Sequence, residues 1–307
     1  MSISSKRTVF YLLALVLFCS SAFAAEKIKV VATTSTFASI VEEITGERAE
    51  VYFVASPKRD IHFIAPTPKD VLKLRRADVF VHGGLDLETW RGPLVDAAGR
   101  REFLSDGEKV IDVSRGIELL EVPAVLTRSA GDVHQFGNPH YWLDPANGKI
   151  IADNIAAGLA RAYPEDAGLF MANAESFKKK LDEKMRVWDE KMRPFKDESI
   201  VTYHNSWPYF VKRFGLIMAG NIEPLPGIPP TAKHISELTR IMEEKKVKVI
   251  VCDSYHEKRT PRKLAEKTGA AVLTFSQAVG DHDEARDYLS MFDYNLSVLK
   301  KAFRGEK

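Results

Sequence analysis

Residues 164–195 read PEDAGLFMANAESFKKKLDEKMRVWDEKMRPF, and their pattern organises the rest of the chain. One face of this segment carries an apolar stripe that steps by three or four residues. The stripe consists of Phe170, Ala174, Phe177, Leu181, Met185, Trp188, Met192 and Phe195. At 1.5 Å per residue it runs roughly 38 Å, which is longer than one lobe needs internally. An ordinary amphipathic surface helix would also explain the stripe, but its length and central position favour a rigid helix joining two lobes.

Apolar, β-rich runs alternate with helical patterns on both sides of this helix, which is typical of parallel sheets built from βαβ units. The expected strands are residues 28–32, 51–54, 78–82, 199–203, 216–222, 247–252 and 271–275. The first expected helix ends at residue 46, and the others cover residues 68–76, 85–98, 145–163, 232–244, 260–268 and 284–303. Residues 117–138 are expected to form an irregular excursion. The fold predicted is therefore α/β, with two lobes, each a mostly parallel β-sheet flanked by helices, joined by one long rigid α-helix. The N-terminal lobe covers residues 25–163, the linker helix 164–195 and the C-terminal lobe 196–307.

Residues 1–24 have the features of a signal peptide. Lys6 and Arg7 form a charged start, an apolar run follows from Val9 to Phe18, and Ala22-Phe23-Ala24 is a small-x-small cleavage site. The apolar run is too short to span a bilayer comfortably, so we expect export to the periplasm with cleavage near Ala24–Ala25. An acylated Cys19 would instead make a lipoprotein. We expect this to be the less favoured outcome, because Phe18 is bulky where a lipid-attachment signal requires a small residue.

The composition of the mature chain narrows the classes of partner. Removal of Lys6 and Arg7 leaves 42 basic and 42 acidic side chains, so neither nucleic acid nor a charged membrane surface is indicated. Cys252 is then the single remaining cysteine, so the exported chain depends on a packed core instead of an internal disulfide. We expect a monomer that binds a small ligand or a protein partner.

Three histidines lie in stiff loops next to predicted strands or prolines. His62 lies in a proline-rich loop, His140 follows Asn138-Pro139, and His204 immediately follows a predicted strand. In open α/β sheets ligands bind beyond the carboxyl ends of strands, and three neutral imidazoles suit a zinc-like ion. Each histidine also has a structural alternative. His62 could simply be exposed, His140 could pack among Tyr141 and Trp142, and His204 could contact the cap of the next helix.

The other five histidines give weaker signals. They are His82, His134, His234, His256 and His282. His82 ends a strand and is expected to make a structural hydrogen bond, and His234 begins a charged helix. His134 stands alone in the irregular excursion, while His256 and His282 occupy loops at strand ends and stay open as candidates.

Together with Leu85-Asp86-Leu87-Glu88-x-Trp90 and the long central helix, the three histidine segments resemble the zinc/manganese solute-binding proteins of bacterial ABC importers. The resemblance covers essentially the whole mature chain, and Asn-Pro-His-x-Trp-Leu-Asp-Pro is its most specific motif. It implies a metal site in the cleft between the lobes, with His62 and His140 as ligands from the N-terminal lobe and His204 as the first ligand from the C-terminal lobe. It also implies delivery of the ion to a membrane permease.

Two features depart from this family pattern. The usual fourth ligand is a carboxylate just after the last strand, where this chain has Phe275-Ser276-Gln277. The fourth position is then water, Asp253, His256 or Asp281. The long histidine- and acid-rich loop of many zinc-specific members is also absent, since His134 is the single histidine in residues 117–138.

The third ligand indicates which metal is bound. Relatives that prefer manganese tend to have a carboxylate there, whereas His204 adds nitrogen, which favours Zn²⁺ over Mn²⁺. We expect zinc as the transported ligand, with Mn²⁺ and Fe²⁺ as alternatives.

Other functions remain open at this stage. A zinc-dependent hydrolase or lyase could use three histidines and a water, although no His-Glu-x-x-His helix is present. A receptor for another small solute and a metal chaperone that serves another protein are further alternatives.

Overall fold

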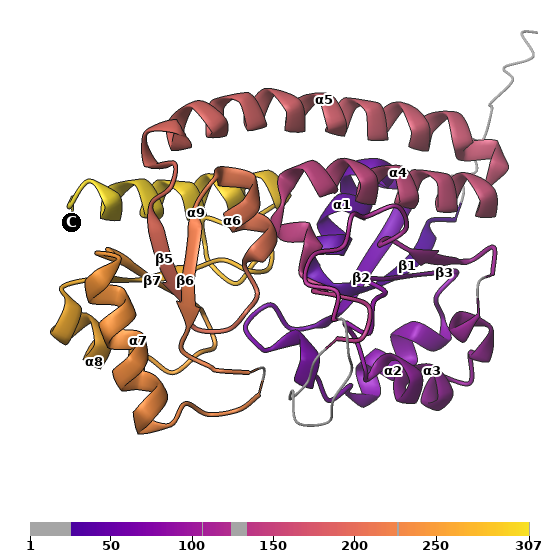
Figure 1. The fold of residues 1–307 in the computed structure, drawn as a ribbon. Coiled ribbons are helices and arrows are strands. Elements are labelled where there is room, and N and C mark those ends of the chain that lie inside the picture. The colour runs from indigo at the N-terminus through magenta and orange to yellow at the C-terminus, as the bar shows by residue number, and fades with distance from the viewer. Residues whose placement is uncertain (1–25, 106, 124–133, 226, 307) are drawn as a thin grey trace, which may run out of the picture.

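Two four-stranded parallel sheets form the two halves of the molecule (Figure 1). The computed structural model describes residues 26–105, 107–123, 134–225 and 227–306. In the N-terminal lobe the strands β1 (Ile28–Thr34), β2 (Ala49–Ala55), β3 (Val79–His82) and β4 (Val110–Asp112) are arranged in the order β2-β1-β3-β4. In the C-terminal lobe β5 (Ser199–Thr202), β6 (Ile217–Asn221), β7 (Val249–Asp253) and β8 (Ala271–Phe275) follow the order β6-β5-β7-β8. The predicted fold class is confirmed.

Helices flank both sheets, and side-chain caps begin several of them. They are α1 (Ser35–Thr45), α2 (Pro68–Arg75), α3 (Arg91–Ala98), α4 (Pro145–Ala162), α5 (Ala167–Met192), α6 (Pro208–Phe214), α7 (Ala232–Glu244), α8 (Arg259–Thr268) and α9 (Tyr288–Phe303). Thr34 accepts a hydrogen bond from the backbone N–H of Phe37, and Asp144 accepts one from Ala146. Both caps stabilise the start of their helices, because Thr and Asp satisfy N–H groups that the first helical turn leaves unpaired.

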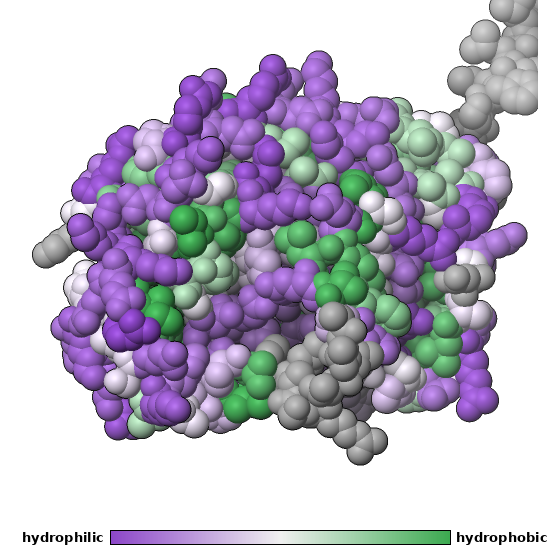
Figure 2. Space-filling model, in the orientation of Figure 1, coloured by the Kyte–Doolittle hydropathy of each residue, from purple (hydrophilic) through white to green (hydrophobic). Residues whose placement is uncertain are grey.

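Helix α5 runs along both halves of the molecule (Figure 1). Short 3₁₀ turns, Pro164–Asp166 and Arg193–Phe195, extend it at its two ends. All eight residues of the predicted apolar stripe are buried, whereas the outward face is mainly hydrophilic (Figure 2). Lys180 of α5 pairs with Glu43 of α1, and Trp188 donates a hydrogen bond to Asp293 of α9. The helix is therefore attached to elements of both lobes, as the stripe predicts.

Helix α9 crosses from the C-terminal half to pack on the N-terminal half. The hydroxyl of Tyr288 donates a 2.7 Å hydrogen bond to the carbonyl of Trp142, and its backbone N–H donates to the hydroxyl of Ser39. The ring of Phe292 lies 5.3 Å from that of Trp188, measured between ring centres. The two lobes are thus joined by two long helices, of which the sequence pattern predicted only α5 in this role.

The structure corrects two of the predicted elements and adds a strand. The helix expected over residues 85–98 begins only at Arg91, because Leu85 and Asp86 adopt positive φ angles of 54° and 56°. The last helix begins at Tyr288, where Asp287 and Ser290 form a capping box, and not at residue 284. Strand β4 has three residues and was not predicted.

Two further predictions concern segments that the structure covers only in part. Residues 117–123 and 134–138 of the expected excursion are irregular, while 124–133 lie outside the described residues, as do residues 1–24 with the signal peptide and Cys19. Within the described ranges, none of the helices combines the length and the apolar character needed to cross a membrane.

Candidate metal centre

His62, His140 and His204 meet in the cleft between the lobes. One ring nitrogen from each lies within 4.8 Å of the corresponding atoms of the other two. His140 and His204 are almost fully buried, at 1% and 6% exposure, so their rings are held away from bulk water. The structure therefore brings together the three histidines that the sequence selected, although they are 78 and 64 positions apart in the chain.

Hydrogen bonds at the far side of two rings fix which nitrogen faces the centre. Nδ1 of His140 lies 3.0 Å from the amide oxygen of Asn138, and Nδ1 of His204 lies 2.7 Å from a carboxylate oxygen of Glu223. Both oxygens are acceptors, so each Nδ1 carries the proton and each Nε2 keeps its lone pair. Nε2 of His140 is 3.1 Å from Nε2 of His62. A cation placed among these nitrogens would receive lone pairs already directed towards it.

The Leu85–Trp90 motif holds the His62 loop in place. Nε1 of Trp90 donates a 2.8 Å hydrogen bond to the carbonyl of Ile61, the residue before His62. Asp60 accepts a hydrogen bond from the backbone N–H of His62 and so caps the short 3₁₀ turn that carries the ring. Glu88 lies beneath, where its buried carboxylate accepts hydrogen bonds from Thr33 and from the backbone of Gly83. The motif therefore positions the loop of a candidate ligand and is not part of a helix.

Asn138 connects the His140 loop to the opposite lobe. Its side-chain amide donates to the backbone carbonyl of Asn205 at 2.9 Å and to the carboxylate of Glu121 at 3.0 Å. The same Glu121 carboxylate accepts from the side chain of Asn205, next to His204. The hydroxyl of Tyr209 donates to the carbonyl of Asn138. Two of the three candidate ligands are thus linked through one hydrogen-bonded network across the cleft.

Burial and mutual proximity keep two of the three imidazoles neutral. Burial lowers the pKa of His62 to about 3, with a further contribution from the nearby His204. Burial also places the pKa of His140 well below its usual value, and both neighbouring histidines act in the same direction. Burial alone would lower the pKa of His204, but the hydrogen bond and charge of Glu223 outweigh it and raise the pKa. Neutral imidazole is the form that binds a metal.

The residues considered for a fourth position lie less favourably. Both carboxylate oxygens of Asp281 accept hydrogen bonds from its own turn, which involves Ser276 and Gln277. His256 stacks on Tyr203, and its ring centre is 6.4 Å from that of His204. Asp253 accepts from Trp207, while its other oxygen is buried without a partner and lies 3.4 Å from Nδ1 of His256. None of these three belongs to the convergent group.

His134 lies in the cleft, although the sequence offered no reason to place it there. Its ring centre is 4.8 Å from that of His62 and 6.3 Å from that of His140. It borders a hollow of about 330 Å³ together with His140, His204 and Glu223. His134 belongs to the part of the sequence where no strand or helix was predicted, so neither periodicity nor a strand end pointed to it.

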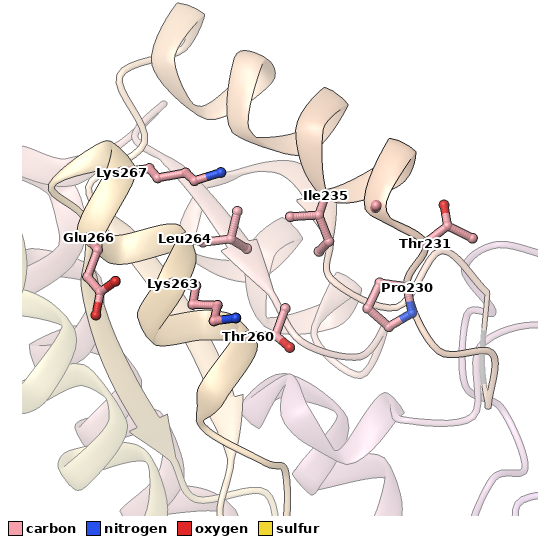
Figure 3. Close-up of a pocket in the computed structure, with 9 residues that line it drawn as sticks. Pro230, Thr231, Ile235, Thr260, Lys263, Leu264, Glu266 and Lys267 are labelled. Atoms are coloured by element: carbon pink, nitrogen blue, oxygen red, sulfur yellow. The ribbon is translucent and has the colours of Figure 1, made fainter.

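A larger hollow lies on the C-terminal lobe, between α7 and α8 (Figure 3). Its volume is about 510 Å³, and Thr231, Thr260, Lys263 and Lys267 border it. Of its lining residues only the apolar Leu264 is buried, so the hollow presents no enclosed polar group that would orient a ligand.

The family assignment rests on nearly the full length of the chain. The model of the family "Zinc-uptake complex component A periplasmic" matches residues 30–302. The chain belongs to this family. Its members are periplasmic metal-binding components of ABC transporters and not enzymes, so the hydrolase or lyase alternative is set aside.

Relatives in this family are named for different metals. The chain is 26% identical to the iron-binding protein YfeA of Yersinia pestis, over 91% of this chain and 87% of that protein. It is 28% identical to the manganese ABC transporter substrate-binding lipoprotein PsaA of Streptococcus anginosus, over 89% and 88% of the two chains. The zinc-binding protein AdcA of Streptococcus pyogenes serotype M1 is 26% identical over 89% of this chain but only 56% of its own length.

Solved structures agree on the fold. A crystal structure of ZnuA superposes with a TM-score of 0.77, covering 90% of this chain and 99% of that one at 22% identity.

The relatives also bear on the predictions of export and of lipid attachment. The family description places its members in the periplasm, in agreement with the predicted export. Several streptococcal relatives, however, are named lipoproteins. These names count against the expectation that lipid attachment at Cys19 is disfavoured, since lipid anchoring is common among relatives of this chain.

Proposed function

We propose that this protein captures Zn²⁺ in the cleft between its lobes and delivers it to the permease of an ABC importer. The observation that carries the proposal is the convergence of His62, His140 and His204, with one ring nitrogen of each within 4.8 Å of the others. In this proposal those three residues are the metal ligands, and the ion is cargo that the protein gives up again.

The donor set supports zinc over the other metals of the family. Among the described residues the convergent group contains imidazoles alone. Imidazole nitrogen suits Zn²⁺, whereas Mn²⁺ prefers carboxylate and water oxygen. In the part of the chain that the structure describes, Glu223 has the only carboxylate in hydrogen-bonding contact with a proposed ligand ring, and it contacts the far nitrogen of His204. Because Cu²⁺ binds most nitrogen sites more tightly than Zn²⁺, selection also depends on which metals are available.

Equilibrium dialysis with elemental analysis tests the proposal. The unaltered protein should retain one equivalent of zinc, and the triple variant His62→Ala, His140→Ala, His204→Ala should retain none. His234→Ala is the matched control, because that histidine neither belongs to the convergent group nor borders the hollow beside it. Stoichiometric zinc in the triple variant would end the assignment of these ligands. Preferential retention of manganese or iron from an equimolar mixture would leave the receptor role intact and overturn the choice of zinc.

Delivery to a permease needs a separate measurement. The zinc-loaded protein should stimulate the ATPase activity of its cognate transporter in proteoliposomes, while the triple variant should not. Transfer of zinc to a soluble acceptor protein, without stimulation of any transporter, would identify a chaperone instead.

A further inference from the structure

The ring of His134 lies beside the three convergent histidines, although its nitrogens are not among the atoms that meet within 4.8 Å of one another. An ion about 2.0–2.1 Å from one nitrogen of each ring, in tetrahedral geometry, puts neighbouring ring centres roughly 5 Å apart. The centres of the His62 and His140 rings are 5.1 Å apart, those of His140 and His204 5.7 Å, and those of His62 and His204 5.9 Å. The ring centre of His134 is slightly closer to that of His62, at 4.8 Å, and slightly farther from that of His140, at 6.3 Å.

The backbone that carries His134 is held by several contacts. The N–H of Gly137 donates a hydrogen bond to the carbonyl of His134 and so closes a turn. The N–H of Asn138 donates a 2.8 Å hydrogen bond to the carbonyl of Leu120. Gly137 has a φ of 113°, and a Cβ there would come 2.8 Å from the same Leu120 carbonyl, so only glycine fits. The side chain of Gln135 donates to Asp86 at 2.6 Å. The ring is therefore presented by a defined turn, four residues before the Asn138 that orients His140.

We propose that His134 is the fourth ligand of the transported ion and completes a site of four imidazoles. The inference rests on the proposed function, since it concerns the same ion. Its basis is that the turn from His134 to Gly137 places this ring at the edge of the three-histidine group, whereas Asp281 is engaged in its own turn. His134 thereby supplies the donor for which the segment Phe275-Ser276-Gln277 has no carboxylate.

A fourth nitrogen affects selectivity as well as affinity. Replacing an oxygen donor or water by imidazole strengthens binding of Zn²⁺ more than that of Mn²⁺. Loss of a partner that merely orients a ligand typically costs 10–100-fold in affinity, so loss of a ligand should cost at least about tenfold. We expect His134→Ala to weaken zinc binding by that factor and to reduce the ratio of zinc to manganese affinity.

X-ray absorption at the zinc edge, which counts coordinating imidazoles, tests the proposal directly. We expect four imidazoles in the zinc-loaded protein and three in His134→Ala, with zinc affinity measured by competition with a chelator. His282→Ala is the matched control, because that ring stacks on Tyr294 away from the cleft. Circular dichroism and thermal unfolding of both variants would confirm that each is folded.

The outcomes separate this inference from the proposed function. One equivalent of zinc with three imidazoles in both the unaltered protein and His134→Ala, at equal affinity, would overturn the role of His134 and leave the receptor assignment standing. Failure of the unaltered protein to bind zinc would overturn both.

Discussion

The ring of Tyr288 packs directly against the backbone of Gly148, so that a Cβ at this position would lie 2.5 Å from Cε1 of the tyrosine. Tyr288 begins α9 at the end of the C-terminal half, and Gly148 lies in α4 of the N-terminal half. The contact shows how closely the two halves are packed.

Substitution of Gly148 by alanine should destabilise the protein. The added methyl group has no room unless Tyr288 shifts and its hydrogen bond to Trp142 is disturbed, and overpacking of this kind costs about 1–3 kcal/mol. Urea unfolding followed by circular dichroism measures the change. Gly168→Ala is the control, since no atom lies within 4 Å of the added Cβ in α5 and alanine favours a helix. Equal stability of Gly148→Ala and the unaltered protein would show that the packing is looser than the structure indicates.

Metal binding should change the overall dimensions very little. Helices α5 and α9 both pack against elements of the two lobes, and long packed helices resist the large rotations that loop hinges permit. We expect the radius of gyration from solution scattering to change by less than about 1 Å when zinc is added, in line with pre-organised binding partners. A contraction of several ångströms would contradict this.

Replacing Glu223 by glutamine should weaken zinc binding although no proposed ligand is altered. The carboxylate holds the proton of His204 on Nδ1 and makes Nε2 a better donor. Loss of such a partner costs roughly 10–100-fold in affinity. Competition with a chromophoric chelator measures it, and Glu118→Gln serves as the control because that acid pairs with Lys212 on the surface. Unchanged affinity would mean that His204 is oriented by its backbone alone.

Zinc affinity should fall as the pH is lowered, and His204 should set the onset. The pKa of His204 is raised above its ordinary value of 6.5, so this ring is the first of the three to take up a second proton as the pH falls. The pKa values of His62 and His140 are lowered, so those rings are neutral over the same range. We therefore expect release of about one proton per zinc near pH 6, detectable by calorimetry in buffers of different ionisation enthalpy. Affinity that stays constant between about pH 5 and 7.5 would contradict the role of imidazole.

Glu88 should make the protein less stable as the pH rises. Burial raises the pKa of this carboxyl from 4.5 to about 7, despite the hydrogen bonds from Thr33 and Gly83 that favour its charged form. Between these two pH values the folded state holds a proton that the unfolded state has lost, so the free energy of unfolding decreases with pH, by about 3 kcal/mol in total. Glu88→Gln should flatten this dependence in urea titrations. A parallel decline in the variant would assign the effect to another group.

The long helix and most strands could be predicted because their physical signals are local. The stripe from Phe170 to Phe195 has a helical period, and all of its members are buried. Strand β4 escaped prediction because three residues carry too little pattern. The prediction of a helix from residue 85 was wrong because Leu85 and Asp86 adopt left-handed backbone angles. Their side chains give no indication of this conformation.

Prediction of the site depended on loops that follow strands. His204 lies two residues beyond the end of β5, and Pro139 restricts the backbone before His140, so both were recognisable. His134 was not, because its position depends on contacts with Leu120 and Asp86 that are distant in sequence. The function of Trp90, which holds the loop of His62 through Ile61, likewise became visible only in three dimensions.

Helices α5 and α9 hold the two halves at a fixed spacing. The protein therefore cannot release its ion by a wide hinge opening. If the three histidines bind the ion as proposed, its release requires only a local displacement of one histidine loop, which would let water reach the ion. A membrane partner would then need to displace only one short loop, and the conformation of the rest of the protein would not change.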